Sequence, residues 1–110
     1  MDNTYTLVSD LGAQEIPSDG ILSRTLYDDE RVKAVVFAFG KGQELSEHTA
    51  SMPAIVQIVK GEARVTLGTD AIEATAGTWA HMPAQLPHSV QARTPLIMLL
   101  LLLKRPGSAG

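Results

Sequence analysis

Three histidines, His48, His81 and His88, are the residues of this chain best suited to metal or acid–base chemistry. The sequence has no cysteine, which excludes disulfide scaffolds, thiolate metal sites, iron–sulfur clusters and cysteine nucleophiles. Any metal ion must therefore be bound by imidazole, carboxylate, amide or water. A tight site for zinc or iron normally uses three or more protein ligands. The chemistry therefore depends on which side chains the fold brings to the histidines.

The elements that must position the histidines are short β-strands. Most segments are rich in β-branched residues or alternate apolar with polar side chains, and turn residues separate them. No stretch long enough for an α-helix has a 3.6-residue apolar period that Gly or Pro leaves uninterrupted. The pattern predicts an all-β sandwich or barrel. Strands are expected at residues 21–27, 31–39, 44–48, 54–60, 62–67, 71–75, 78–82, 88–93 and 96–104.

Length and charge indicate one small domain without a surface for nucleic acid. At 110 residues the chain can form a single core. Its net charge is −3, so it lacks the basic character of nucleic-acid-binding proteins. The longest apolar run, residues 96–103, falls far short of the roughly 20 residues of a membrane span. The polar, acidic N-terminus carries no targeting signal. We expect a cytoplasmic protein that binds neither nucleic acid nor membrane.

Two stretches around His48 and His88 resemble the two sequence motifs of the cupin superfamily. The first motif is G-x5-H-x-H-x3/4-E-x6-G, the second is G-x5-P-x-G-x2-H-x3-N, and residues 59–63 resemble a segment common in small cupins. The similarity covers residues 20–104 and implies an RmlC-like cupin, a double-stranded β-helix or jelly-roll barrel of one domain. The motif positions are occupied here by Gly42, His48, Ala50, Ala54 and Gly61, and by Gly77, Pro83, Gln85, His88 and Ala92.

The resemblance implies that His48 and His88 are metal ligands. Cupin sites typically add a second histidine and a glutamate from the first motif, but Ala50 and Ala54 stand at those positions. Two of the four usual ligands are therefore missing. A divalent ion such as Fe, Mn, Ni, Cu or Zn would need water, a third side chain or a bound carboxylate to complete its coordination.

Three residues are candidates for a third ligand. Gln57 lies three residues beyond Ala54, so strand alternation places it on the opposite face unless a bulge intervenes. His81 precedes Met82, and the two should likewise face opposite sides. Glu47 adjoins His48 in sequence, although a solvent-facing position is the simpler interpretation.

The two alanines should also leave space inside the barrel. We expect a concave, mostly apolar pocket in which the two imidazoles are the polar groups, as is typical of small-ligand sites. Alternatively, flexible methionines such as Met52 and Met98 fill that space. The predicted pocket residues are Ala50, Ala54, Val56, Ile58, Met82 and Val90.

The apolar run at residues 96–103 predicts a homodimer. Because it does not alternate, both faces of this strand should be buried. One face can pack in the barrel, and the other needs cover from the N-terminal segment or a second subunit, since an exposed apolar ribbon would aggregate. The expected divisions are 1–20 as an N-terminal segment and candidate dimer contact, 21–104 as the cupin domain and 105–110 as a disordered tail.

Two classes of function remain open. In the first, His48 and His88 hold a divalent metal, and the resemblance then suggests a dioxygenase or isomerase acting on a small polar organic molecule. In the second, the protein is a metal-free cupin whose histidines contact a small ligand or each other. A shared fold does not decide between them, because cupins host many unrelated functions.

Overall fold

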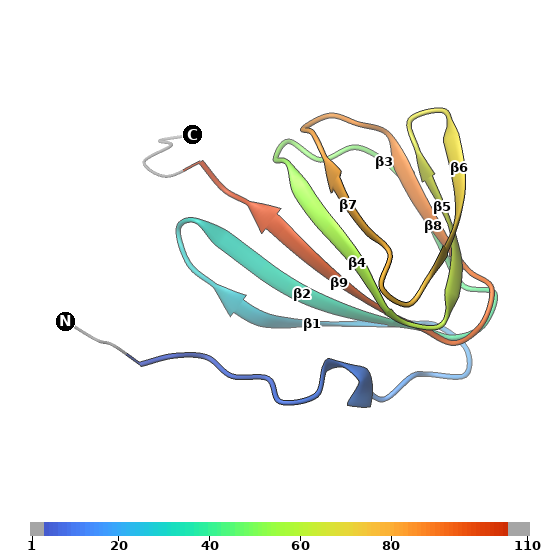
Figure 1. Ribbon diagram of the computed structural model, residues 1–110, viewed down its shortest axis with the longest axis horizontal. Helices are drawn as coiled ribbons and strands as arrows, with labels where there is room; N and C mark the ends of the chain where they lie inside the picture. The colour runs from blue at the N-terminus through green and yellow to red at the C-terminus, as the bar shows by residue number, and fades with distance from the viewer. Residues whose placement is uncertain (1–3, 106–110) are drawn as a thin grey trace.

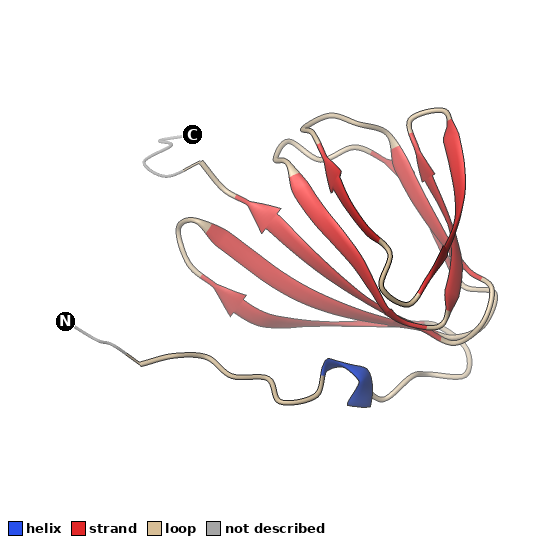
Figure 2. Ribbon diagram, viewed as in Figure 1, coloured by secondary structure: helices blue, strands red, loops and turns tan. Residues whose placement is uncertain are grey.

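The structure of the protein is a computed structural model that describes residues 4–105. A single turn of 3-10 helix, η1 (Leu11–Ala13), precedes the strands within these residues, as Figure 2 shows. The strands are β1 (Ile21–Asp28), β2 (Val32–Phe39), β3 (Glu44–His48), β4 (Ala54–Lys60), β5 (Glu62–Leu67), β6 (Asp70–Thr75), β7 (Trp79–Met82), β8 (His88–Ala92) and β9 (Leu96–Leu103).

The strands form two antiparallel sheets that face each other (Figure 1). The larger sheet has the order β1-β2-β9-β4-β7, and the smaller has the order β3-β8-β5-β6. The last two strands thus insert between strands that are distant in sequence: β9 between β2 and β4, and β8 between β3 and β5. The chain is all-β with the jelly-roll arrangement, as the sequence predicted.

Each expected strand is present, and no strand end differs from the prediction by more than one residue. The hairpin between β5 and β6 illustrates the small differences. Leu67 pairs directly with Asp70, so the turn consists of Gly68 and Thr69 alone, and Asp70 already belongs to the strand. Gly68 has a φ of 62°, which a two-residue hairpin turn requires and glycine tolerates.

The core lies between the two sheets and follows the predicted alternation. Ala63 and Val65 of β5 are buried, whereas Glu62 and Arg64 are exposed. Strand β4 places Ala54, Val56 and Ile58 inside in the same way. The strand period of two therefore decides which side chains can reach the barrel interior.

Strand β9 changes character along its length. Leu96, Ile97 and Met98 are buried, with at most 3% of each residue exposed. From Leu99 to Leu103 every residue is only partly buried. The second half of this leucine-rich strand, residues 99–103, therefore keeps some of its apolar surface exposed among the described residues.

Gly61, which links β4 to β5, packs closely against the backbone of the segment that leads into β9. Its φ is 91°, and a Cβ at this position would lie 2.2 Å from the carbonyl oxygen of Pro95. Any side chain would therefore collide with backbone as well as adopt a strained conformation. This explains the glycine that ends the first motif.

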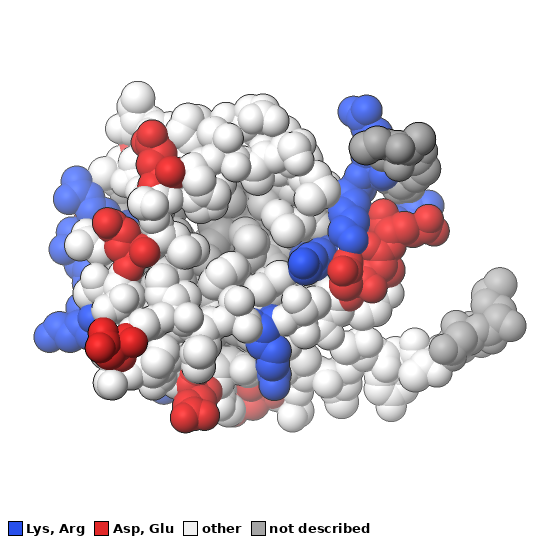
Figure 3. All heavy atoms as spheres, turned by 180° about the vertical axis from the view of Figure 1, so that it is seen from behind, with Lys and Arg blue, Asp and Glu red and all other residues white. Residues whose placement is uncertain are grey.

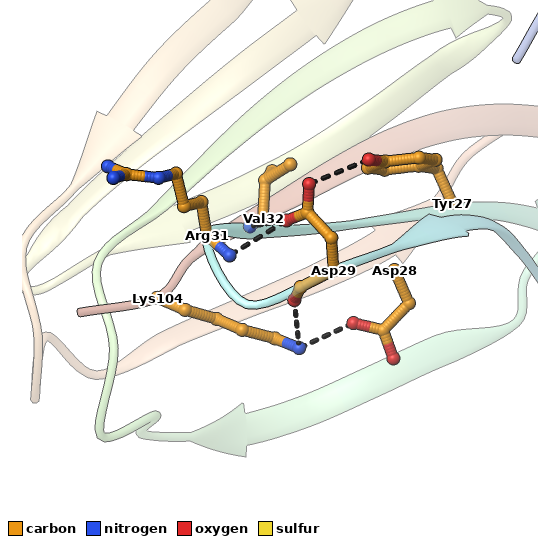
Figure 4. Close-up of polar contacts among 6 residues, drawn as sticks. All are labelled: Tyr27, Asp28, Asp29, Arg31, Val32 and Lys104. Carbon is orange, nitrogen blue, oxygen red and sulfur yellow. Dashed lines mark hydrogen bonds and ion pairs between the residues drawn. The ribbon is translucent and has the colours of Figure 1, made fainter. Parts of the chain in front are cut away.

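The turn between β1 and β2 is organised by one carboxylate, as Figure 4 shows. Asp29 Oδ1 accepts hydrogen bonds from the backbone N–H groups of Arg31 (2.7 Å) and Val32 (2.9 Å). Asp29 Oδ2 accepts a 2.7 Å hydrogen bond from the Tyr27 hydroxyl. The Tyr27 hydrogen bond, followed by the two backbone donors, lowers the pKa of Asp29 to about 2. The same contact raises the pKa of Tyr27.

The end of β9 is tied to the same turn. The Lys104 ammonium forms an ion pair with Asp28 and donates a 2.8 Å hydrogen bond to the Asp29 carbonyl oxygen (Figure 4). We call Tyr27, Asp28, Asp29 and Lys104 the turn clamp. It joins two parts of the chain about 75 residues apart in sequence.

The segment before β1 is mostly extended and runs outside the two sheets (Figure 1). Tyr5 and Leu7 are 81% and 75% exposed, so this arm buries little of its own apolar surface. At the other end of the chain, Arg105 is exposed, and the rest of the predicted tail lies outside the described residues.

Charged side chains of both signs occur on one face of the molecule. On the face shown in Figure 3, acidic and basic residues are interspersed and form no extended patch of one sign. Between residues 4 and 105, no helix has the length and apolar character needed to cross a membrane.

Candidate functional site

Two strand ends of the smaller sheet bring His48 and His88 together. His48 is the last residue of β3 and His88 the first of β8, and the two are paired directly across the antiparallel ladder. Directly opposed residues share a sheet face, so both imidazoles point the same way. Their ring centroids are 4.2 Å apart at an interplanar angle of 60°. An irregularity between Leu45 and His48 sets this register.

Both imidazoles are oriented by the same type of backbone contact. His48 Nδ1 lies 2.8 Å from the carbonyl oxygen of Ser46, and His88 Nδ1 lies 2.8 Å from that of Leu86. A carbonyl oxygen only accepts hydrogen bonds, so Nδ1 must carry the proton in each ring. In the neutral imidazole, Nε2 then has a free lone pair. Among the described residues, neither Nε2 atom has a hydrogen-bond partner.

The imidazoles border two adjoining cavities, an outer and an inner chamber, which share part of their lining. The outer chamber has a volume of about 230 Å³ and includes Ala50 and Ala54, the residues at the two missing ligand positions. His48 is exposed, which leaves a path from this chamber to solvent. The chamber is lined by His48, Ala50, Met52, Ala54, Met82, Pro83, His88, Leu100 and Leu102.

The inner chamber is smaller, about 60 Å³, and lies deeper between the sheets. Its wall is aliphatic and aromatic apart from the two imidazoles. Four residues line both chambers and mark the junction between them: His48, Met82, His88 and Leu100. The residues that line the inner chamber alone are Phe37, Leu45, Val56, Val65, Val90 and Met98.

The cavity contains no charged side chain apart from any charge on the imidazoles. Among residues 4–105, no Asp, Glu, Lys or Arg lines either chamber. A bound ion would therefore meet no opposite charge from the wall, and a buried uncompensated charge is costly. The site favours a mostly apolar guest with one polar group near the two Nε2 atoms.

The loop that precedes β8 is fastened to the loop that follows β3. Gln85 donates a 2.8 Å backbone hydrogen bond to the carbonyl oxygen of Ala50, which lines the outer chamber. Gln85 has a φ of 69°, a left-handed conformation that costs a residue with a Cβ about 1 kcal/mol. This position is a glycine in the second cupin motif, which accounts for the unusual backbone.

Most of the sequence-predicted pocket residues lie at this cavity. Ala50, Ala54 and Met82 line the outer chamber, and Val56, Val90 and Met82 line the inner one. Ile58 is different. It is buried inside the barrel, but it sits near the opposite end of β4 from Ala54, beside Thr78, and lines neither chamber.

The three candidate third ligands lie elsewhere. Gln57 and His81 are exposed on the outer face of the larger sheet, because they alternate with the inward-facing Val56 and Met82. Glu47 is exposed beside His48. None of the three lines either chamber. Within residues 4–105, no group of three or more His, Asp or Glu side chains could hold a metal ion.

Sequence reasoning missed much of the cavity wall. Phe37, Leu45, Val65 and Leu100 come from four different strands, and only the pairing of the strands brings them to the histidines. Filling of the space by Met52 and Met98 was the alternative to an open pocket. Both line it instead, Met52 in the outer chamber and Met98 in the inner one.

The donor set fits a divalent metal only in part. Two oriented imidazoles are suitable ligands, because metal-binding histidines usually donate their other N–H to an oxygen acceptor. They lack the third histidine or carboxylate that a tight divalent site needs. Water or a bound molecule would have to complete the coordination.

Comparison with known proteins supports the fold directly. No protein-family model and no curated protein matches the chain. Among solved structures, a conserved protein of unknown function from Streptococcus pyogenes is 32% identical, with a TM-score of 0.83 over 94% of this chain and 92% of that one.

Two structures named as cupins resemble the chain as well. A cupin 2 conserved barrel domain protein from Leptotrichia buccalis is 28% identical, with a TM-score of 0.80 over 88% of this chain and 47% of that one. A cupin superfamily protein from Desulfitobacterium hafniense is 24% identical, with a TM-score of 0.80 over 86% of this chain and 87% of that one. With its jelly-roll sheets and with His48 paired to His88 beside both chambers, the chain has the fold of the small single-domain, RmlC-like cupins.

Proposed function

We propose that this cupin binds a small, uncharged and mostly apolar organic molecule in its two-chamber cavity. The observation that carries the proposal is the pair of histidines in an otherwise apolar wall. In each, Nδ1 is bonded to backbone and Nε2 has no partner within residues 4–105. Neither Nε2 is shut off from a ligand, because His48 is exposed and no buried side-chain nitrogen or oxygen among residues 4–105 lacks a partner. Two Nε2 acceptors beside an apolar chamber therefore suit a ligand that donates a hydroxyl or amide hydrogen.

Four probe molecules of similar size test this proposal. Phenol and 1-hexanol are neutral donors, whereas hexanoate and hexylamine carry a charge. We expect the two neutral probes to shift the backbone NMR signals of cavity residues in β3 and β8 and to bind more tightly than the charged ones, because the wall offers no compensating charge.

A matched pair of variants locates the binding. Ala50→Leu reduces the outer chamber and should abolish the shifts, whereas Ala71→Leu makes the same change at an exposed position of β6 and should leave them unchanged. Equal binding of all four probes, or binding that survives both Ala50→Leu and the loss of both histidines, would contradict the proposal.

A divalent metal at His48 and His88 is a second candidate, and the two Nδ1 hydrogen bonds favour it. Such an ion, of Fe, Mn, Ni, Cu or Zn, would be completed by water or by the bound molecule. Elemental analysis of the untagged protein should then find stoichiometric metal that is absent from the His48→Ala/His88→Ala variant. No metal in the parent protein after incubation with Fe²⁺, Mn²⁺ and Zn²⁺ would contradict this candidate.

We also propose that the cupin domain, residues 21–104, dimerises through the outer face of its larger sheet. Leu99 and Leu101 on this face are only partly buried, and Leu101 is flanked by Ala34 and Ile55. Trp79 extends the apolar surface and is 58% exposed. The arm at residues 4–10, with its exposed Tyr5 and Leu7, provides further surface that a second copy could bury.

The solution mass tests the dimer. Light scattering at micromolar concentration should give twice the chain mass of 11.8 kDa, and Leu101→Glu should give a folded monomer. Ile72→Glu changes an exposed apolar residue of the smaller sheet and is the control that should stay dimeric. A parent protein with the mass of one chain would rule the dimer out.

A further inference from the structure

A methionine lines both chambers together with the two histidines. Met82 ends β7 and is 4% exposed, and its partner across the ladder is Ala54. Together with His48, His88 and Leu100, it is one of the four residues that line both chambers. Three residues that carry potential metal donors, two with an imidazole and one with a thioether, therefore line both chambers.

These donors share two chemical properties. All three are neutral when they bind a metal, because each imidazole uses a lone pair on Nε2 and the thioether sulfur has no proton to lose. They are also soft or borderline ligands. Thioether sulfur selects copper(I), and imidazole suits copper, whereas carboxylate and water suit Mg, Ca and Mn.

The lack of charged groups in the cavity wall also favours copper(I) over a divalent ion. Among the residues that the structure describes, no carboxylate lines either chamber, so the wall leaves both charges of a divalent ion uncompensated. Copper(I) carries a single charge and accepts two or three ligands. It is therefore the common biological metal ion that best matches a small, neutral nitrogen and sulfur set in an apolar wall.

We propose that His48, His88 and Met82 bind one copper(I) ion, with Nε2 of each histidine and Sδ of the methionine as the ligands. The site rests on the same cavity as the proposed small-molecule function, but it does not depend on that ligand. It differs from the usual cupin set because sulfur replaces the carboxylate and the second histidine of the first motif. The proposal assigns no redox step.

The first test is an anaerobic titration with copper(I) in competition with bicinchoninate. The parent protein should take up one copper(I) ion per chain. Met82→Leu nearly preserves side-chain volume and should weaken binding at least about tenfold, since even the loss of a residue that only supports a ligand typically costs 10–100-fold in affinity. His48→Ala and His88→Ala should weaken it by at least as much.

Matched variants separate coordination from general packing. Met98→Leu removes a thioether that borders only the inner chamber, and it should have a clearly smaller effect than Met82→Leu. His81→Ala removes the exposed histidine on the outer sheet face and should leave copper binding unchanged. A titration with Zn²⁺ under the same conditions should give weaker binding than copper(I).

A spectroscopic measurement keeps the test independent of folding defects. With selenomethionine in place of methionine, the X-ray absorption spectrum of the copper should contain a selenium neighbour, and this signal should vanish in Met82→Leu. No copper(I) uptake, equal affinities of the parent and Met82→Leu, no selenium neighbour, or tighter binding of Zn²⁺ would each overturn the proposal. Phenol and 1-hexanol binding is measured on the metal-free protein, so failure of one proposal is distinguishable from failure of the other.

Discussion

The turn clamp and the histidine pair are both built from polar residues at strand ends, but their polar atoms are used differently. In the turn clamp, both Asp29 carboxylate oxygens accept hydrogen bonds from the chain itself, and Lys104 bonds to a side chain and a backbone carbonyl. In the histidine pair, each ring has one nitrogen bonded to backbone while the other has no partner among residues 4–105.

The difference separates a structural role from a binding role. Hydrogen bonds within the chain contribute to folding, so their loss should lower stability. A polar atom without a partner contributes little to folding and remains available to a ligand or metal. Stability should therefore depend on the turn clamp, and binding should depend on the histidines.

The largest expected effect is on binding, from the removal of both histidines. The His48→Ala/His88→Ala variant should lose probe binding by at least about tenfold, equivalent to roughly 1.4 kcal/mol, because both Nε2 acceptors disappear. Isothermal titration calorimetry with 1-hexanol measures this loss. Thermal unfolding should show a smaller fall in Tm than that of Asp29→Ala, because the histidine variant loses two hydrogen bonds to backbone and Asp29→Ala loses three hydrogen bonds. A larger fall in Tm than that of Asp29→Ala would contradict the division of roles.

The next effect is on stability, from the removal of the carboxylate that organises the β1–β2 turn. Asp29→Ala deletes the acceptors for Tyr27, Arg31 and Val32 and should lower the Tm, whereas Asp29→Asn retains an acceptor oxygen and should lower it less. Thermal unfolding ranks the variants, with Asp19→Asn as an exposed control outside these contacts. Altered probe binding in either Asp29 variant would show that the two regions are coupled.

A smaller effect should appear in acid. The pKa of Asp29 is lowered from 3.8 to about 2, so its contribution to stability is present above the unfolded value and is lost as the pH falls toward 2. Chemical unfolding between pH 5 and pH 2 should show a difference between the parent and Asp29→Asn that narrows with decreasing pH. A difference that stays constant over this range would assign the effect to something other than the charge of Asp29.

The smallest effect is expected at the loop beside the histidines. Gln85→Gly removes the strain of a φ of 69° but adds freedom to the unfolded chain, so stability should stay within about 1 kcal/mol of the parent. Gln85→Val places a β-branched residue in the same conformation and should be less stable than Gln85→Gly by about 1 kcal/mol. Denaturant unfolding measures both, and the opposite order would mean that the backbone changes conformation in the variants.

The sequence predicted the strands well because their signals are local. Alternation in β5 and the turn residues around Gly68 and Gly77 depend on neighbours within a few positions. The same alternation correctly placed Val56 on the inner face and Gln57 on the outer face of β4. The cupin motifs added the pairing of distant strands, which local patterns do not contain.

The details of the site depend on long-range register and could not be read from the sequence. The pairing of His48 with His88 follows an irregularity in β3, where a shift by one residue would turn the imidazole outward. The Nδ1 contacts with the carbonyl oxygens of Ser46 and Leu86 depend on the path of the backbone over the two residues before each histidine. Met82 was predicted to line the cavity. That it lines both chambers follows only from the three-dimensional arrangement of the strands.

The position of Trp79 has a practical consequence for spectroscopy. It is the only tryptophan of the chain, and it lies on the outer face of the larger sheet, 58% exposed. If a second copy covers that face, the fluorescence of the indole should shift to shorter wavelength as protein concentration rises. Guests that enter the barrel from the other side of the sheet should leave the emission unchanged. One intrinsic fluorophore can thus distinguish association of two chains from occupation of the cavity, without a label.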